Sequence, residues 1–181
     1  MYKRQVEDNY ITGTLADLVT PIQLWRVDNA TVKDNAIVVT DSGDHQAINI
    51  SKMEEDAQIE ITGNMIRGVG GGIYVTTWLL GGRTEGAPGK FTGTVEIMYN
   101  TLYCAESEMD PIFAGYEKAP AASGQYYGAF EGTLTVGGNT NNGDPAVAVV
   151  GQVPRITATF QDGSTVIDKI TGCLLYTSRC V

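Results

Sequence analysis

Two aspartates that each precede a proline are the first candidates for chemistry in this sequence. Asp110-Pro111 and Asp144-Pro145 stand before two similar short apolar stretches. Aligning those stretches places the two carboxylates about 5 Å apart on neighbouring strands. Two carboxylates that close repel each other, so they require a shared proton, a basic partner or a cation such as Ca²⁺. The same separation is typical of the acid and nucleophile of retaining glycosidases. The alternative is a plain turn, in which Asp before Pro is common.

Amide and aromatic side chains form a second set of candidates. Four stretches have an apolar residue at every second position: residues 21–25, 47–51, 72–76 and 111–115. In a strand, the residues between the apolar ones point to the opposite face. They are Gln23, Asn49, Tyr74 and Phe113, with Trp25 in the neighbouring column. Aromatic faces beside hydrogen-bonding amides suit sugar rings, so we predict a glycan-binding face here. The alternative is that the aromatic rings only pack beneath adjacent loops.

Basic side chains lie in two long segments that follow the third and fourth of these stretches. Residues 77–90 contain Arg83 and Lys90, and residues 116–128 contain Lys118. Long loops on a rigid scaffold commonly carry function. Beside a glycan-binding face, these cations would neutralise an acidic sugar. The alternative is a pair of solvent-facing loops without a ligand.

The elements that must position these side chains repeat along the chain. Each copy reads apolar residue, two variable residues, Asn, variable residue, apolar residue, and the fifth copy lacks the last apolar residue. The repeated asparagines are 26, 29, 36 and 39 residues apart: Asn9, Asn35, Asn64, Asn100 and Asn139. A short alternating strand lies on each side of most of them, and the 21–25 type of stretch supplies a third. Three strands per copy predict a coil whose strands form three parallel sheets.

This Asn-bearing pattern resembles the right-handed parallel β-helix repeat of pectate-lyase-like proteins, whose inward Asn side chains stack as a ladder between two sheets. An amide both donates and accepts, so identical side chains can bond along such a stack. The resemblance covers nearly all of residues 6–172 and implies an all-β solenoid of about five to six rungs. It also implies that the third sheet forms a polysaccharide cleft. The alternative fold is an antiparallel β-sandwich with Asn in its turns.

Composition excludes two classes of partner. The chain has 181 residues and a formal net charge of −9, and it lacks the clustered Lys and Arg that bind a nucleic-acid backbone. No apolar run approaches the roughly 18 residues of a membrane-spanning helix. We therefore expect neither nucleic acid nor a membrane span.

The two ends of the sequence resemble translated sequencing adapter. Residues 1–5 read as GTG TAT AAG AGA CAG, a transposon mosaic end, and residues 173–181 read as its other strand. We therefore exclude both ends and expect one domain over residues 6–172. We expect this domain to be an internal segment of a larger β-helix, whose remaining rungs would be its partners.

The sequence thus predicts a β-helix that engages polysaccharide, outside the cell, on its surface or on a virion. If the chain is an enzyme, we expect a polysaccharide lyase or glycoside hydrolase, with Asp110 and Asp144 as acid/base pair or cation ligands. The alternatives are a non-catalytic surface adhesin, a phage tailspike-like coil, or a structural scaffold.

Overall fold

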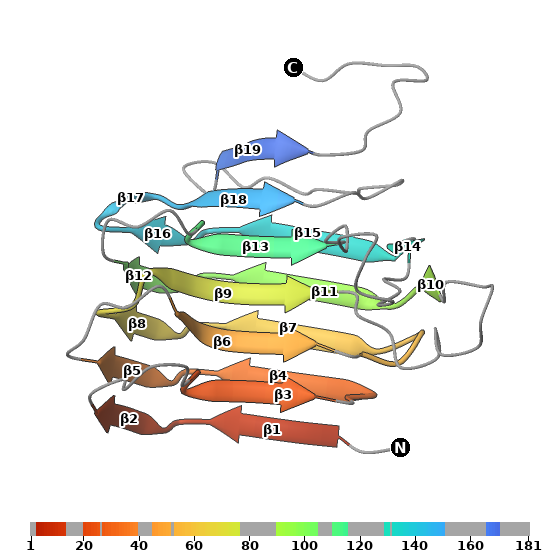
Figure 1. Ribbon diagram of the computed structural model, residues 1–181, viewed down its shortest axis with the longest axis horizontal. Coiled ribbons are helices and arrows are strands. Elements are labelled where there is room, and N and C mark those ends of the chain that lie inside the picture. Colours follow the sequence, from red (N-terminus) through yellow and green to blue (C-terminus); the bar gives the residue numbers. More distant parts are fainter. Residues whose placement is uncertain are drawn as a thin grey trace, which may run out of the picture.

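The fold consists of three long, mainly parallel sheets (Figure 1). The computed structural model describes residues 3–13, 20–25, 27–39, 45–51, 53–76, 90–104, 110–115, 129–130, 132–150 and 166–170. Within these ranges the chain is all-β and contains no helix. The chain passes through the three sheets in turn, and one such pass makes a rung. The predicted all-β class with parallel sheets is therefore confirmed.

Each sheet takes one strand from every rung. The first sheet has five parallel strands: β1 (Lys3–Glu7), β4 (Asn29–Lys33), β7 (Gln58–Thr62), β11 (Thr94–Met98) and β15 (Thr133–Gly137). The second sheet ends in an antiparallel strand and contains β2 (Tyr10–Gly13), β5 (Ala36–Val39), β8 (Met65–Arg67), β12 (Thr101–Tyr103), β16 (Thr140–Asn141) and β17 (Asp144–Pro145). The third sheet has six parallel strands: β3 (Ile22–Trp25), β6 (Gln46–Ser51), β9 (Gly71–Thr76), β13 (Ile112–Gly115), β18 (Val147–Val150) and β19 (Val166–Ile170). A separate parallel pair joins β10 (Lys90–Phe91) to β14 (Ala129–Phe130).

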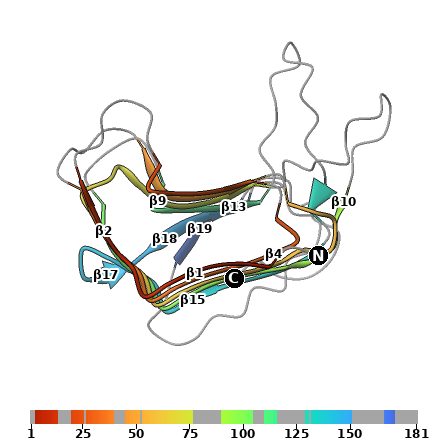
Figure 2. The same ribbon diagram turned by 90° about the horizontal axis from the view of Figure 1, so that it is seen from below.

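The core lies between the sheets, because alternate residues of each strand point inward. The first and third sheets face each other, and the second lies along one side of both (Figure 2). Ile61 of the first sheet, Ile66 of the second and Ile48 of the third are fully buried. Burial of such columns is the main term that stabilises the stack.

The predicted Asn ladder is confirmed. It runs along the turn between the first and second sheets, and four of its five members are buried: Asn35, Asn64, Asn100 and Asn139. The backbone N–H and the Nδ2 of each Asn donate to the Oδ1 of the Asn in the next rung, at 2.9 to 3.1 Å. Each ladder Oδ1 after the first therefore accepts two bonds. This arrangement satisfies polar groups in the core that water cannot reach.

The backbone before each ladder Asn has a left-handed conformation. The φ angles at this position lie between 52° and 67° in all five rungs: Asp8, Asp34, Gly63, Tyr99 and Gly138. Asp and Gly adopt this region more readily than other residues, whereas Tyr99 does so at a cost. The ladder thus requires the same sharp turn in every rung.

The fifth rung departs from the expected alignment. In the third sheet, Ile112 of β13 pairs with Ala148 of β18, whereas the sequence alignment placed Ile112 opposite Ala146. The cause is a two-residue turn at Asn142 and Gly143, which both have positive φ angles. Such an Asn-Gly pair favours a tight hairpin, and here it folds β17 back against β16.

The hairpin removes the alignment that placed the two predicted carboxylates on neighbouring strands. Asp144 pairs with Asn141 at the edge of the second sheet, whereas Asp110 stands just before β13 of the third sheet. The prediction that Asp110 lies over Asp144 is therefore wrong.

Two sequence predictions concern the ends and the membrane. Within the described ranges no helix is long and apolar enough to cross a bilayer. Of the two predicted adapter segments, Lys3 to Gln5 lie in β1 and pair in register with Asn29 to Thr31 of β4. Residues 173–181 lie outside the described residues.

Replacing one buried ladder Asn tests the role of the ladder. We expect Asn64→Ala to lower the free energy of unfolding by about 3 kcal/mol or more, because it leaves buried donors of Asn35 without an acceptor. The matched control is Asn29→Ala, since the Gln58 N–H that donates to Asn29 Oδ1 also donates to the Asp28 carbonyl. Urea denaturation of both variants measures the difference, and equal losses of stability would contradict a special role for the ladder.

Candidate functional site

The predicted outward column on the third sheet exists. Parallel pairing places Gln23 opposite Asn49, Asn49 opposite Tyr74, and Tyr74 opposite Phe113. Their strand neighbours Ile48, Ile73 and Ile112 are buried, so the column lies on the outer face of the sheet. Gln23 is exposed, and the other three are half-buried. The register predicted from the sequence is therefore right over these four rungs.

The two aromatic rings of this column stack on each other. The ring centroids of Tyr74 and Phe113 are 4.5 Å apart, and the ring planes differ by 17°. This distance is close to the spacing of neighbouring strands, so the rings continue the stacking of their rungs. The faces between the rings are already in contact and cannot receive a sugar. The sequence predicts that both rings present flat faces outward, whereas this geometry limits them to their edges and outer faces.

Trp25 is the aromatic side chain of this sheet that is most exposed to solvent among the described residues. Its exposed fraction is 47%, and the exposed Gln23 precedes it by two positions on β3. Ser51, which pairs with Trp25, is 5% exposed. The neighbouring column is therefore accessible at Trp25 but not at Ser51.

Asn49 carries a buried polar atom without a hydrogen-bond partner. Its Oδ1 has no donor within the described structure, and its Nδ2 makes a long 3.5 Å bond to Gln46 Oε1. A buried acceptor without a partner costs free energy unless water or a ligand supplies a donor. The Asn49 side chain therefore places an acceptor without a described partner in the third sheet.

The basic residues predicted beside this face are not placed by the structure. Arg83 and Lys118 lie outside the described residues, and for Lys90 the structure describes only the backbone of β10. Their roles remain predictions.

The predicted cation site rested on an alignment of Asp110 with Asp144 that the register of β13 and β18 does not reproduce. Asp110 and Asp144 are both exposed; Asp144 lies in β17 of the second sheet, whereas Asp110 precedes β13 of the third sheet. Across the described ranges, no group of three or more His, Cys, Asp or Glu side chains could hold a metal ion. The roles of Asp110 and Asp144 as an acid/base pair or as Ca²⁺ ligands therefore stay predictions.

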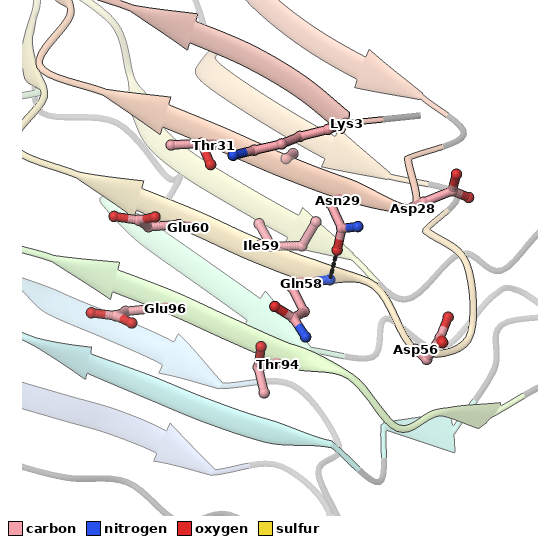
Figure 3. Close-up of a pocket in the computed structure, with 11 residues that line it drawn as sticks. Lys3, Asp28, Asn29, Thr31, Asp56, Gln58, Ile59, Glu60, Thr94 and Glu96 are labelled. Carbon is pink, nitrogen blue, oxygen red and sulfur yellow. Dashed lines mark hydrogen bonds between the residues drawn. The ribbon is translucent and has the colours of Figure 1, made fainter. Parts of the chain in front are cut away.

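A groove that the sequence analysis missed lies on the outer face of the first sheet (Figure 3). We call it the first-sheet groove. Its volume is about 560 Å³, within the range of roughly 300–1,000 Å³ for small-molecule sites. Asn29 and Gln58 form part of its wall, and the Gln58 N–H donates to Asn29 Oδ1 at 3.1 Å. Four carboxylates also line it: Asp28, Asp56, Glu60 and Glu96.

Glu60 and Glu96 are two carboxylates that the register of the first sheet places side by side. They pair directly across β7 and β11 and point to the same face. Neighbouring strands are about 4.8 Å apart, so two like charges meet along this wall. The signal was present in the repeat, because Ile59-Glu60-Ile61 aligns with Val95-Glu96-Ile97.

Comparison of the chain with models of protein families, with curated proteins and with solved structures found no match. The site therefore has to be interpreted from its own geometry.

Cys104 is a free cysteine that lies buried in the core. Burial raises the pKa of its thiol from 9.0 to about 11, so the thiolate form is disfavoured in the folded state. Because the folded pKa is the higher one, this contribution to stability is intact below pH 9 and is lost as the pH rises towards 11.

The pH dependence of unfolding tests this assignment. We expect the free energy of unfolding to fall between pH 9 and pH 11 more steeply in the natural chain than in Cys104→Ala. Denaturation curves across this range measure the difference. Parallel curves for the two proteins would show that the thiol is not protected in the core.

Proposed function

We propose that the chain is a right-handed parallel β-helix of the pectate-lyase-like kind and that it engages polysaccharide. Three observations support the fold assignment: the parallel sheets, the Asn ladder between the first two sheets, and the in-register third strands. The handedness and the family rest on the resemblance in the sequence. A glycan partner would place the chain outside the cell, on a cell surface or on a virion.

The exposed Trp25 beside Gln23 carries the proposal. An indole that is half exposed on a flat sheet offers an apolar face to a sugar ring, and a neighbouring amide supplies donors and acceptors for hydroxyl groups. Tyr74 and Phe113 contribute differently, because they stack on each other. Their role in this proposal is to hold the face rigid, and the hydroxyl of Tyr74 adds a polar contact.

Binding without turnover is the function that the third-sheet face supports best. The alignment that paired Asp110 with Asp144 for a catalytic role is interrupted by the hairpin at Asn142 and Gly143. An adhesin or tailspike-like role requires no such pair. In the same proposal, Arg83, Lys90 and Lys118 neutralise an acidic sugar that is bound at this face.

A glycan array followed by titration with a retained polysaccharide tests this proposal. We expect Trp25→Ala to weaken binding about tenfold or more, because the stacking face is lost. Tyr10→Ala is the matched control, since Tyr10 is also an exposed aromatic, at 69%, but lies on the second sheet. Failure to retain any glycan, or equal weakening by both substitutions, would contradict the proposal.

Glycoside hydrolysis in the first-sheet groove is the second candidate function. Glu60 and Glu96 supply it, because they pair on neighbouring strands, whose spacing of about 4.8 Å is near the carboxyl separation of roughly 5–5.5 Å in retaining glycosidases. One would act as nucleophile and the other as acid and then base.

Substitution of the two glutamates tests the hydrolase candidate. With a polysaccharide that the chain cleaves, we expect Glu60→Gln and Glu96→Gln each to lower kcat about 100-fold or more. Asp56→Asn is the matched control, because Asp56 lines the same groove at its other end (Figure 3). Release of reducing ends measures turnover. A natural chain that cleaves no polysaccharide, or variants with unchanged rates, would remove this candidate.

A further inference from the structure

A short hairpin in the second sheet carries a chemically reactive pair of residues. Asn142 and Gly143 form its two-residue turn, with φ angles of 54° and 89°. The turn folds β17 back against β16, and β17 is the outermost described strand of this sheet (Figure 1). Both turn residues are exposed, and a Cβ atom added at Gly143 would meet no other atom within 4 Å. Water therefore has free access to this turn.

Glycine after asparagine makes the asparagine amide labile. The backbone nitrogen of the next residue can attack Cγ of the Asn side chain, and glycine leaves this nitrogen unobstructed because it has no Cβ. Asn142 is the only asparagine of this sequence that glycine follows. The sequence therefore makes Asn142 the most susceptible of its asparagines.

Hydrogen bonds to the end of β12 hold Asn142 in the closed hairpin. Its backbone N–H donates to the Leu102 carbonyl at 2.8 Å, and its Nδ2 donates to the Cys104 carbonyl at 3.2 Å. Attack on Cγ requires the side chain to turn towards the Gly143 nitrogen, and the bond to Cys104 opposes this rotation. The reaction therefore proceeds from an opened hairpin, a local excursion that is common at the edge of a sheet.

We propose that Asn142 is a site of spontaneous deamidation, that the closed hairpin protects it, and that its conversion opens the edge of the second sheet. The Gly143 nitrogen loses its proton to hydroxide and bonds to Asn142 Cγ, the Cγ–Nδ2 bond breaks, and ammonia leaves. Water then opens the cyclic imide at either carbonyl, which yields aspartate or isoaspartate. The net reaction consumes water and releases ammonia, and nothing is oxidised or reduced.

Conversion removes one contact of the hairpin and adds repulsion. The carboxylate that replaces the amide cannot donate, so two acceptor oxygens meet where Nδ2 bonded the Cys104 carbonyl. A second negative charge also enters a hairpin that already contains Asp144. Isoaspartate lengthens the main chain by a methylene group, which a two-residue turn of this type does not accommodate. Because neither product regains the amide, the opening is a one-way change.

Peptide mapping of the full chain by mass spectrometry tests where the chain is modified. The chain is kept in mildly alkaline buffer, either folded or unfolded in urea, and isoaspartate is quantified with isoaspartyl methyltransferase. We expect Asn142 to convert at least about tenfold faster than Asn29, a half-buried surface asparagine that Ala30 follows. We also expect conversion of Asn142 to be at least about threefold slower in the folded chain than in urea.

Two substitutions separate the new charge from the lost amide. Asn142→Asp reproduces one product, whereas the matched control Asn142→Gly removes the same donor, adds no charge and permits the positive φ. Hydrogen exchange at the Ala146 N–H reports opening, because this group donates to the Asn139 carbonyl at 2.9 Å across the hairpin. We expect this exchange to be about fivefold or more faster in Asn142→Asp than in Asn142→Gly.

Three results would overturn the proposal. The first is that Asn142 does not convert, or that another asparagine of the folded chain converts before it. The second is an equal rate at Asn142 in the folded chain and in urea, since the hairpin would then give no protection. The third is equal exchange at Ala146 in the two variants. None of these measurements involves a glycan, so the outcome is independent of the proposed function.

Discussion

The hydrogen bonds between successive Asn side chains are the constraint on which the rest of this structure depends. Each Oδ1 from Asn35 to Asn139 receives both a backbone and a side-chain donor from the preceding rung. Such an Asn can neither shift by one residue nor turn outward without leaving buried groups unpaired. This requirement fixes the register of the first and second sheets. Insertions are accommodated elsewhere, and the spacing between Asn residues therefore varies from 26 to 39 without a change of register.

Because the register is fixed, residues at the same position of successive repeats lie side by side on the surface. Some of these contacts are favourable and others are unfavourable. Tyr74 and Phe113 gain a stacked contact because they occupy the same position in neighbouring rungs. Glu60 and Glu96 occupy another shared position and bring like charges together. A fold of this kind keeps such a pair because the core and the ladder determine its register. Functional proposals for this chain therefore follow from which side chains share a column.

Much of this arrangement could be predicted from the sequence, because the period of the repeat is physical. The ladder residues, the buried isoleucines of the third sheet and the outward column through Asn49 all follow from a fixed register. The position of Asp144 could not be obtained by extending that register, because the Asn142-Gly143 hairpin adds a local turn. Ring orientation at Tyr74 and the first-sheet groove depend on three-dimensional packing that a linear pattern does not contain.

Hydrogen exchange of the Asn side-chain amides, followed by nuclear magnetic resonance, tests the ladder most directly. The Nδ2 protons of Asn35, Asn64 and Asn100 are bonded and buried, whereas Asn29 is half exposed at the surface of the first sheet. The account predicts exchange at least about 100-fold slower for the three ladder amides than for Asn29. Exchange at the same rate in all four would contradict a ladder that holds the rungs in register.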